Sequence, residues 1–270
     1  MGLFQPVLVH VVRGGVMVDS VGASVVAIHS SSGCVELTAS ATVHNFRATS
    51  VLVNLNLTIG NDNDSSGSSD RNAVAMTSVS VSLAANSSTT VAFNATTTPA
   101  LASVCGVHLW HPWRHGSQAM ANITVTASAD RTHLDTARRR VGLRKVTSAL
   151  DANGYRLFHV NDKPFMVYGG GYSPHLFLRY NSTYQVQLAA LTCILLAATT
   201  HAHTHTHTHA HAHTRIHTHT HPCPLLQRTM LTAARAMGLN TVRLEGKMMT
   251  DDFFHITDEL GIMVLPGEQW

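Results

Sequence analysis

A strand–helix–strand pattern near the end of the sequence constrains the fold more than any other feature. A short β-type run at residues 241–244 precedes a helical segment that opens on Asp251 and Asp252 and stops at Gly261, before a second apolar strand at residues 262–265. Strand, helix and strand at this spacing form a βαβ unit, whose two strands lie parallel in one sheet. The pattern therefore predicts a parallel α/β fold for this part of the chain.

Two charged residues, Arg243 and Glu245, stand at the carboxyl end of the first of these strands. Parallel α/β barrels carry their chemistry at the carboxyl ends of the strands, so both are candidate site residues. Each also has a structural interpretation, because Arg243 could form an ion pair within the fold and Glu245 could be a solvated loop carboxylate. The pattern alone leaves these alternatives open.

In the first half of the chain the apolar residues follow a different pattern, alternating with polar ones. Residues 51–59 read VLVNLNLTI, in which apolar and polar residues alternate as in a strand with one buried face. Similar runs, separated by polar turns, occupy residues 35–43, 79–83, 89–93 and 121–127. Short strands at this spacing predict an immunoglobulin-like β-sandwich over residues 20–145. Trp110 and Trp113 are expected to anchor this sandwich, with a stacking platform for a sugar ring as the alternative.

The charge balance argues against two classes of partner. The formal net charge is +3 and 12% of residues are charged, which is too little to indicate binding to nucleic acid or to an anionic membrane. The basic triplet at residues 138–140 is expected to be a solvated strand end. The longest uncharged apolar run, residues 188–198, is too short to span a bilayer, and no signal peptide is visible at the start.

Several motifs follow one another in the order known from one family of enzymes. NTVRLEG, DDFFHITDELGI and PG, from residue 240 onward, are similar to the start of that family's catalytic barrel. YRLFHVNDKPFMVYGGGYSPHLFLRYN and VGLRKV resemble its passage into the barrel, LWHPWRHGSQ a segment of its middle domain, and MGLFQPVLVHV the last strand of its sugar-binding jelly roll. The family is glycoside hydrolase family 2, and the resemblance is strongest to its exo-β-D-glucosaminidases, which trim chitosan-type chains.

The resemblance implies three regions. Residues 1–19 would be the remnant last strand of the jelly roll, residues 20–145 the sandwich, and residues 146–270 the N-terminal part of an incomplete parallel (β/α)8 barrel. Within the barrel, residues 165–168 would form strand one, with GGGY turning the chain at its end. Residues 228–237 and 252–260 would form the first two helices.

Half of the 20 histidines lie between His201 and His221, alternating mainly with threonine and alanine. A metal-binding tract is one interpretation, and translated CA-repeat DNA is the other. Compared with the family, removing residues 186–227 joins RYNSTYQ to RTMLTAARAMGLN without a gap. The removed piece begins on a valine codon, which starts GT, and ends on a glutamine codon compatible with CAG. We therefore expect a retained intron at residues 186–227. The alternating threonines and histidines have no apolar face to bury, so residues 184–226 are expected to form no packed structure.

The resemblance also implies roles for the site residues. Retaining glycosidases use two carboxylates, and in this family both are glutamates placed after later barrel strands, so no catalytic residue is assigned here and Glu268 is given no role. Arg243 would orient the missing nucleophile. Glu245 would pair with the C2 ammonium of glucosamine. His175 stands where the family commonly has aspartate.

The expected function is that of a fragment of a retaining glycoside hydrolase, acting on β-linked glucosamine chains from the non-reducing end. As it stands the fragment would be inactive, and neither a cofactor nor a metal is expected. Its partner would be a β-linked amino-sugar oligosaccharide. The alternatives are a fragment of a β-mannosidase-type enzyme and a non-enzymatic sandwich fragment or pseudogene product.

Sequons and enzyme class together favour a secreted or lysosome/vacuole-like parent enzyme. The N-x-S/T sequons lie at Asn56, Asn63, Asn86, Asn94, Asn122 and Asn181. Cys34 and Cys105 could pair in an oxidising compartment, and buried free thiols are the alternative.

Overall fold

The computed structural model describes residues 12–62, 73–172, 224–245, 249 and 251–266. The chain divides into two compact units, whose described residues lie within 12–167 and 168–266. Each unit has its own hydrophobic core. The two are therefore treated separately below.

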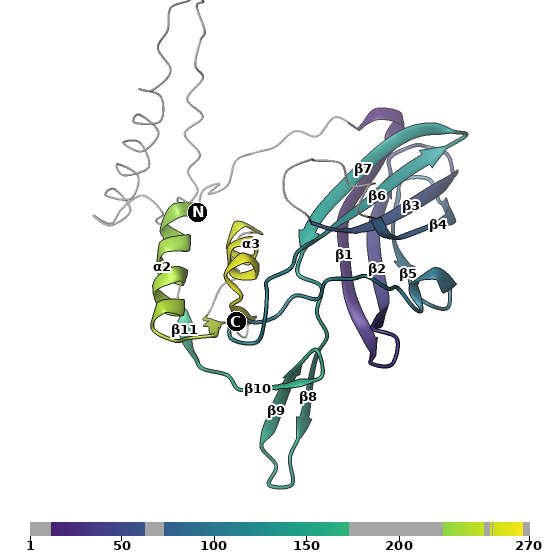
Figure 1. Cartoon of the computed structure of the whole chain (residues 1–270). Coiled ribbons are helices and arrows are strands. Elements are labelled where there is room, and N and C mark those ends of the chain that lie inside the picture. The colour runs from purple at the N-terminus through teal and green to yellow at the C-terminus, as the bar shows by residue number, and fades with distance from the viewer. Residues whose placement is uncertain (1–11, 63–72, 173–223, 246–248, 250, 267–270) are drawn as a thin grey trace, which may run out of the picture. The chain divides into compact units, whose positions relative to one another are not determined.

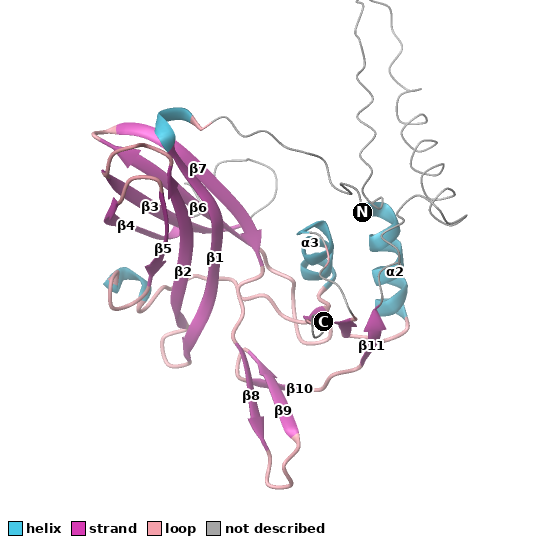
Figure 2. Cartoon of the chain, turned by 180° about the vertical axis from the view of Figure 1, so that it is seen from behind, coloured by secondary structure: helices cyan, strands magenta, loops and turns pink. Residues whose placement is uncertain are grey.

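The first unit contains a two-layered β-sandwich (Figures 1 and 2). Its sheets have the strand orders β1–β2–β5 and β4–β3–β6–β7, and every neighbouring pair is antiparallel. The strands are β1 (Val16–His29), β2 (Cys34–Asn45), β3 (Val51–Asn61), β4 (Ala73–Leu83), β5 (Ser87–Phe93), β6 (Ala121–Ala129) and β7 (Thr132–Val141), with the 3-10 turns η1 (Arg13–Gly15) and η2 (Pro99–Leu101). The pairing of β4 with β3 differs from the constant-type immunoglobulin order, in which the fourth strand joins the first sheet.

The alternation in β3 builds the centre of the sandwich core. Val53, Leu55, Leu57 and Ile59 are at most 1% exposed, whereas Leu52 is 63% exposed. Successive side chains of a strand point to opposite faces, so one face of β3 packs inward and the other faces solvent. The strand predicted at residues 51–59 is confirmed, and the other predicted runs fall within β2, β4, β5 and β6.

A disulfide between Cys34 and Cys105 fastens the start of β2 to the loop that precedes β6. Their Cα atoms are 4.1 Å apart across a sequence separation of 71 residues. The neighbouring residues Val35 and Val104 exchange two backbone hydrogen bonds of 2.8 Å. This short antiparallel bridge aligns the two cysteines, so of the two interpretations offered by the sequence the structure shows the paired one.

The sandwich begins earlier than expected. β1 starts at Val16, not at residue 20, and pairs with β2 over its length. Val16 and Val18 are buried in the sandwich core, which is why residues 16–19 belong to this unit. Residues 1–11, where the jelly-roll strand was expected, lie outside the described residues.

A second, small sheet follows the sandwich, with the order β10–β9–β8. It is made of β8 (Val146–Leu150), β9 (Arg156–Val160) and β10 (Lys163–Phe165), all antiparallel. Asn161 and Asp162, with φ of 52° and 61°, form the two-residue turn between β9 and β10, the conformation that tight hairpins favour. Placing barrel strand one at residues 165–168 was therefore wrong, because Phe165 pairs with Phe158 in this hairpin.

The second unit is built on a parallel sheet in the order β11–β12–β13. The strands are β11 (Gly169–Tyr172), β12 (Thr241–Leu244) and β13 (Met263–Leu265), and the helices are α2 (Pro224–Ala236) and α3 (Asp251–Leu260). Gly238 and Gly261 follow the two helices with φ of 90° and 73°. Glycine adopts this left-handed conformation without steric penalty, so each helix ends at a residue suited to reverse the chain. The predicted βαβ pattern is confirmed, whereas GGGY forms a strand and not the turn that was expected.

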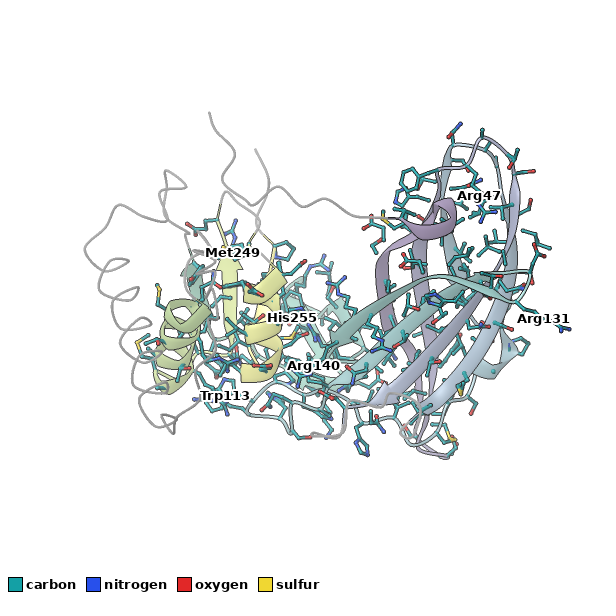
Figure 3. The ribbon with its side chains drawn as sticks, turned by 90° about the horizontal axis from the view of Figure 1, so that it is seen from above. Arg47, Trp113, Arg131, Arg140, Met249 and His255 are labelled. Atoms are coloured by element: carbon teal, nitrogen blue, oxygen red, sulfur yellow. A yellow bond between two sulfur atoms is a disulfide. The ribbon has the colours of Figure 1, made fainter. Side chains whose placement is uncertain are left out.

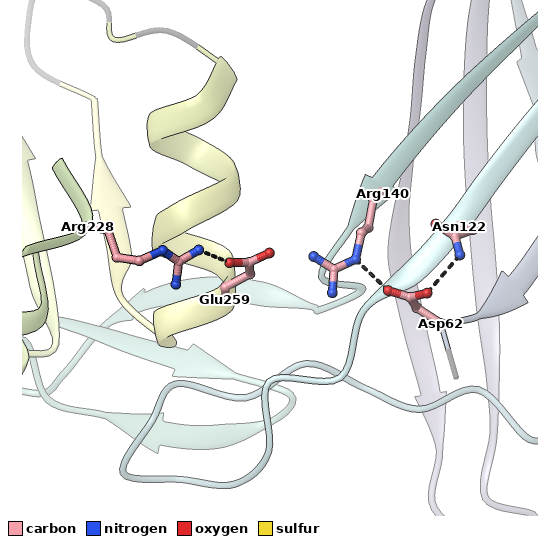
Figure 4. Close-up of polar contacts among 5 residues, drawn as sticks. All are labelled: Asp62, Asn122, Arg140, Arg228 and Glu259. Atoms are coloured by element: carbon pink, nitrogen blue, oxygen red, sulfur yellow. Dashed lines mark hydrogen bonds and ion pairs between the residues drawn. The ribbon is translucent and has the colours of Figure 1, made fainter. Parts of the chain in front are cut away.

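Both helices pack on one side of this sheet. Leu231 of α2 and Phe253 and Ile256 of α3 share a buried cluster with Val242 and Leu244 of β12. Arg228 of α2 and Glu259 of α3 form an ion pair across the helices (Figure 4). None of the helices in the described ranges is long and apolar enough to cross a membrane.

Helix α2 starts earlier than predicted. It begins at Pro224 and not at Arg228, and Gln227 is only 4% exposed. The end of the expected insert, residues 224–227, is therefore helical, and its last residue is buried. The expectation of no packed structure covered residues 184–226, so Gln227 lies just beyond it. Residues 186–223, including the histidine tract, lie outside the described residues.

Candidate functional site

The two described helices, α2 and α3, pack on one face of the parallel sheet, and both candidate residues lie on the opposite face. Val242 and Leu244 of β12 are buried against the helices, so the residues between and after them, Arg243 and Glu245, point to the opposite face. Both are exposed. We call this the open face. Its described members are Gly169 and Gly171 of β11, Thr241, Arg243 and Glu245, and Met263 and Leu265 of β13. Thr241 and Met263, at the amino ends of their strands, are buried, whereas Arg243 and Glu245 are exposed.

Arg243 lies at the middle of the open face. It is in register with Gly171 on one side and Leu265 on the other. Within the described part of the chain, Arg243 has no carboxylate within ion-pair distance. The interpretation of Arg243 as a structural ion pair therefore finds no support in the described residues, among which its side chain is exposed.

Glu245 continues β12 by one step and lies beside the end of β11. Its backbone N–H donates to the carbonyl oxygen of Tyr172 at 3.2 Å. The carboxylate lies over Gly171: a Cβ placed on Gly171 would be 2.8 Å from Cδ of Glu245 and closer still to one of its oxygens. Although Glu245 is exposed, as a solvated carboxylate would be, its head group is therefore held against the neighbouring strand.

The amino ends of the three strands are joined by a residue that the sequence analysis missed. Asn240 is 1% exposed, its N–H donates to Tyr168 O at 2.8 Å and its carbonyl accepts from Met263 N at 2.9 Å. Its side-chain oxygen also accepts from Tyr168 N at 2.9 Å. Because both backbone and side chain are bound, Asn240 fixes β12 in register and so fixes where Arg243 and Glu245 emerge. An asparagine directly before a β-type run was the only signal in the sequence.

Behind the sheet, Tyr172 packs its ring on Phe253 of α3, with centroids 5.1 Å apart. Burial raises the pKa of the Tyr172 phenol, since the charged form is penalised in an apolar setting. Met249 packs against the same cluster before α3 begins, and His255 lies on α3 (Figure 3). This aromatic support is on the helix side, away from Arg243 and Glu245.

The tryptophans take different positions in the first unit. Trp110 is fully buried, and the guanidinium of Arg144 lies 4.3 Å from its ring centroid. A stacking platform for a sugar needs an accessible ring, so Trp110 is structural. Trp113 is partly exposed, with Arg114 at 4.7 Å from its ring centroid.

Several predicted features cannot be placed. His175, Glu268, the histidine tract and the sequons at Asn63 and Asn181 lie outside the described residues. In the described ranges, no group of three or more histidine, cysteine, aspartate or glutamate side chains is arranged to hold a metal ion.

Comparison with known proteins shows which enzymes the chain is similar to. No family model matches it. It is 30% identical over 185 residues to the exo-β-D-glucosaminidase of Streptomyces avermitilis. The aligned region covers 68% of this chain and 16% of that enzyme. The chain thus spans about a sixth of the length of this relative.

Solved structures agree with the sequence match. The exo-chitosanase CsxA of Amycolatopsis orientalis is 28% identical, with a TM-score of 0.65 over 96% of this chain and 23% of that enzyme. A variant of it has been solved in complex with PNP-β-D-glucosamine. A glycosyl hydrolase family 2 member from Bacteroides cellulosilyticus, 15% identical, shares the fold with a TM-score of 0.61 over 93% of this chain and 26% of its own. Over the part of these enzymes that it spans, the chain belongs to glycoside hydrolase family 2 and is exo-β-D-glucosaminidase-like.

Proposed function

We propose that this chain is part of a retaining exo-β-D-glucosaminidase, which releases glucosamine from the non-reducing end of β-linked, chitosan-type chains. In this proposal the parallel sheet with α2 and α3 is the beginning of a (β/α)8 catalytic barrel, and the sandwich is the domain before it. The enzyme's two catalytic glutamates would lie in later barrel strands. The chain by itself is therefore expected to have no glycosidase activity.

The observation that carries the proposal is the position of Arg243 and Glu245. Both project from the carboxyl end of one parallel strand, on the face opposite α2 and α3. In α/β barrels this end of the sheet carries the catalytic and binding groups. A carboxylate there attracts the protonated amine of glucosamine and gives no such advantage to a neutral sugar. A guanidinium fork suits the carboxylate of a nucleophile.

The proposal includes the gene and the compartment. Residues 186–223, with the first residues of α2, would derive from a retained intron, because their removal restores a continuous family sequence. The Cys34–Cys105 disulfide supports an oxidising compartment such as the secretory route. The exposed sequon residue Asn86, in the turn between β4 and β5, is accessible to a glycan.

The test uses the complete enzyme, in which this chain is joined to the remaining barrel. Glu245→Gln should lower kcat/KM on glucosaminides by roughly ten- to a thousandfold, since it removes a charge-assisted contact to an ammonium. On neutral mannosides the same change should have a much smaller effect. Arg243→Ala, as the matched variant, should lower activity on both sugars alike.

The measurement is kcat/KM of both variants on paired glucosaminide and mannoside substrates. An equal loss on both sugars for Glu245→Gln would contradict amine recognition and favour a β-mannosidase-type enzyme. Release of glucosamine from chitosan oligomers by the purified 270-residue chain would contradict the assignment of the catalytic groups to other parts of the enzyme.

A further inference from the structure

The run Gly169-Gly170-Gly171 forms β11, although glycine weakens a strand. Glycine has no side chain, so its backbone loses more conformational freedom on folding than that of any other residue. None of the three has a positive φ, so the backbone conformation does not require glycine. The reason for glycine must then lie in the space around each position, and that space differs among the three.

A Cβ at each position would meet different neighbours. At Gly169 it would be 2.9 Å from the carbonyl carbon of Thr241, which is backbone of the adjacent strand. At Gly170 it would meet nothing within 4 Å. At Gly171 it would overlap the carboxylate of Glu245, with Cδ at 2.8 Å. Only Gly171 thus makes room for a side chain of the candidate site.

We infer that Gly171 is a positioning residue for Glu245: the missing side chain leaves the place in which the carboxylate lies against β11. If a side chain at position 171 fills that space, the carboxylate of Glu245 must move away from the sheet. Its backbone anchor to Tyr172 O would remain, because the group that is displaced is the far end of a flexible side chain. The inference rests on the proposed function, since it assigns Gly171 to the same amine recognition.

The three glycines supply their own controls. In the 270-residue chain, Gly171→Ala should leave the thermal midpoint close to that of the unchanged chain, and Gly170→Ala should do the same. Gly169→Ala should lower the midpoint by several degrees, roughly the effect of about 1 kcal/mol or more in a chain of this size, because backbone cannot move aside cheaply. A nuclear Overhauser contact between the Hγ protons of Glu245 and the Hα protons of Gly171 should be present in the unchanged chain and in Gly170→Ala. It should be lost in Gly171→Ala.

Function is then measured in the complete enzyme. Gly171→Ala should reduce the preference for glucosaminides over mannosides by about tenfold, because a charged hydrogen bond depends on correct placement of both groups. Gly170→Ala should leave the preference unchanged. Adding Glu245→Asp to Gly171→Ala should recover part of it, since the shorter side chain stops before the new methyl group.

Three results would overturn the inference. The first is persistence of the Glu245–Gly171 contact in Gly171→Ala, and the second is an unchanged sugar preference after the contact is lost. In the second case, a lowered preference in Glu245→Gln would show that amine recognition survives while the role of Gly171 fails. The third is a loss of preference in Gly170→Ala as large as in Gly171→Ala, since this would point to a general effect on β11.

Discussion

The side-chain amide of Asn161 donates a 2.9 Å hydrogen bond to the carbonyl oxygen of Trp110. The same residue donates its N–H to Lys145 O at 2.8 Å, and its side-chain oxygen accepts from Lys145 N at 2.9 Å. One buried asparagine thus joins the β9–β10 turn, the strand-to-strand connection after β7 and the Trp110 loop. Asparagine and aspartate are suited to such junctions, because they tolerate a positive φ and their short side chains bind nearby backbone groups.

Asn161→Gly should lower the free energy of unfolding of the first unit by about 1–3 kcal/mol, since backbone groups lose buried partners while the φ of the turn stays accessible. Asp162→Gly is the matched control, because Asp162 has a similar φ of 61° but an exposed carboxylate paired with Lys145 Nζ. Its effect should stay below about 1 kcal/mol. Urea unfolding measures both, and equal effects of the two variants would contradict the role of Asn161.

Acid should weaken the same region through His111. Burial, with Lys163 and His115 adding positive charge, lowers the His111 pKa from its ordinary value of 6.5. The unfolded chain therefore binds a proton at a higher pH than the folded chain does, and the free energy of unfolding falls as the pH drops through 6.5 toward the folded pKa. Urea unfolding between neutral pH and about pH 5 should show a shallower fall in His111→Gln than in the exposed control His133→Gln. Parallel profiles for the two variants would rule His111 out as the cause.

Reduction of the disulfide should destabilise the sandwich. The cross-link between Cys34 and Cys105 closes a long loop, so its loss should lower the free energy of unfolding by about 2–5 kcal/mol. The measurement compares thermal unfolding of the chain with and without dithiothreitol. The Cys34→Ser/Cys105→Ser variant is the control, since it should unfold at the temperature of the reduced chain and respond to reductant no further.

Removal of residues 186–227 should leave the second unit folded. The deletion places Gln185 directly before Arg228, where Gln227 stands in the present chain, so the buried glutamine at the start of α2 is replaced by another. The expected result is an unchanged or higher thermal midpoint, because a long connection of low apolar periodicity is lost. Deletion of residues 185–227 leaves Tyr184 there instead and should be less stable. A deletion variant in which α2 no longer forms a helix would argue against a retained intron.

The sequence predicted those elements whose signal is local. The alternation of β3 and the β12–α3–β13 pattern both depend on neighbours a few residues apart, and glycines mark the ends of α2 and α3. The hairpin of β9 and β10 has a local signal too, in the Asn161-Asp162 turn, but its strands were assigned to the barrel. β11 had no signal at all, because three glycines have no strand propensity and only the contact with β12 makes them a strand.

The candidate site was predictable in its residue types but not in its geometry. The alternation of Val242, Arg243 and Leu244 already indicates that Arg243 and Glu245 share a face. The overlap between Glu245 and the space at Gly171 depends on the register of two strands that are far apart in the sequence, and no residue pattern reports it. The same holds for Asn240, whose hydrogen bonds reach Tyr168, just before β11, and Met263 of β13.

The enclosure of Trp110 gives the first unit an internal optical reporter. A Cβ on Gly142 would be 2.5 Å from Cδ1 of the indole, and the Arg144 guanidinium covers the ring. Two of the residues that follow β7, Gly142 and Arg144, therefore pack against this one side chain. Light emitted by a ring so enclosed lies at shorter wavelength than that of a hydrated indole, and dissolved quenchers such as iodide reach it poorly. In a variant that keeps Trp110 but lacks Trp113 and Trp270, the colour of the emission should therefore record whether the connection between β7 and β8 is packed on Trp110, without any added label.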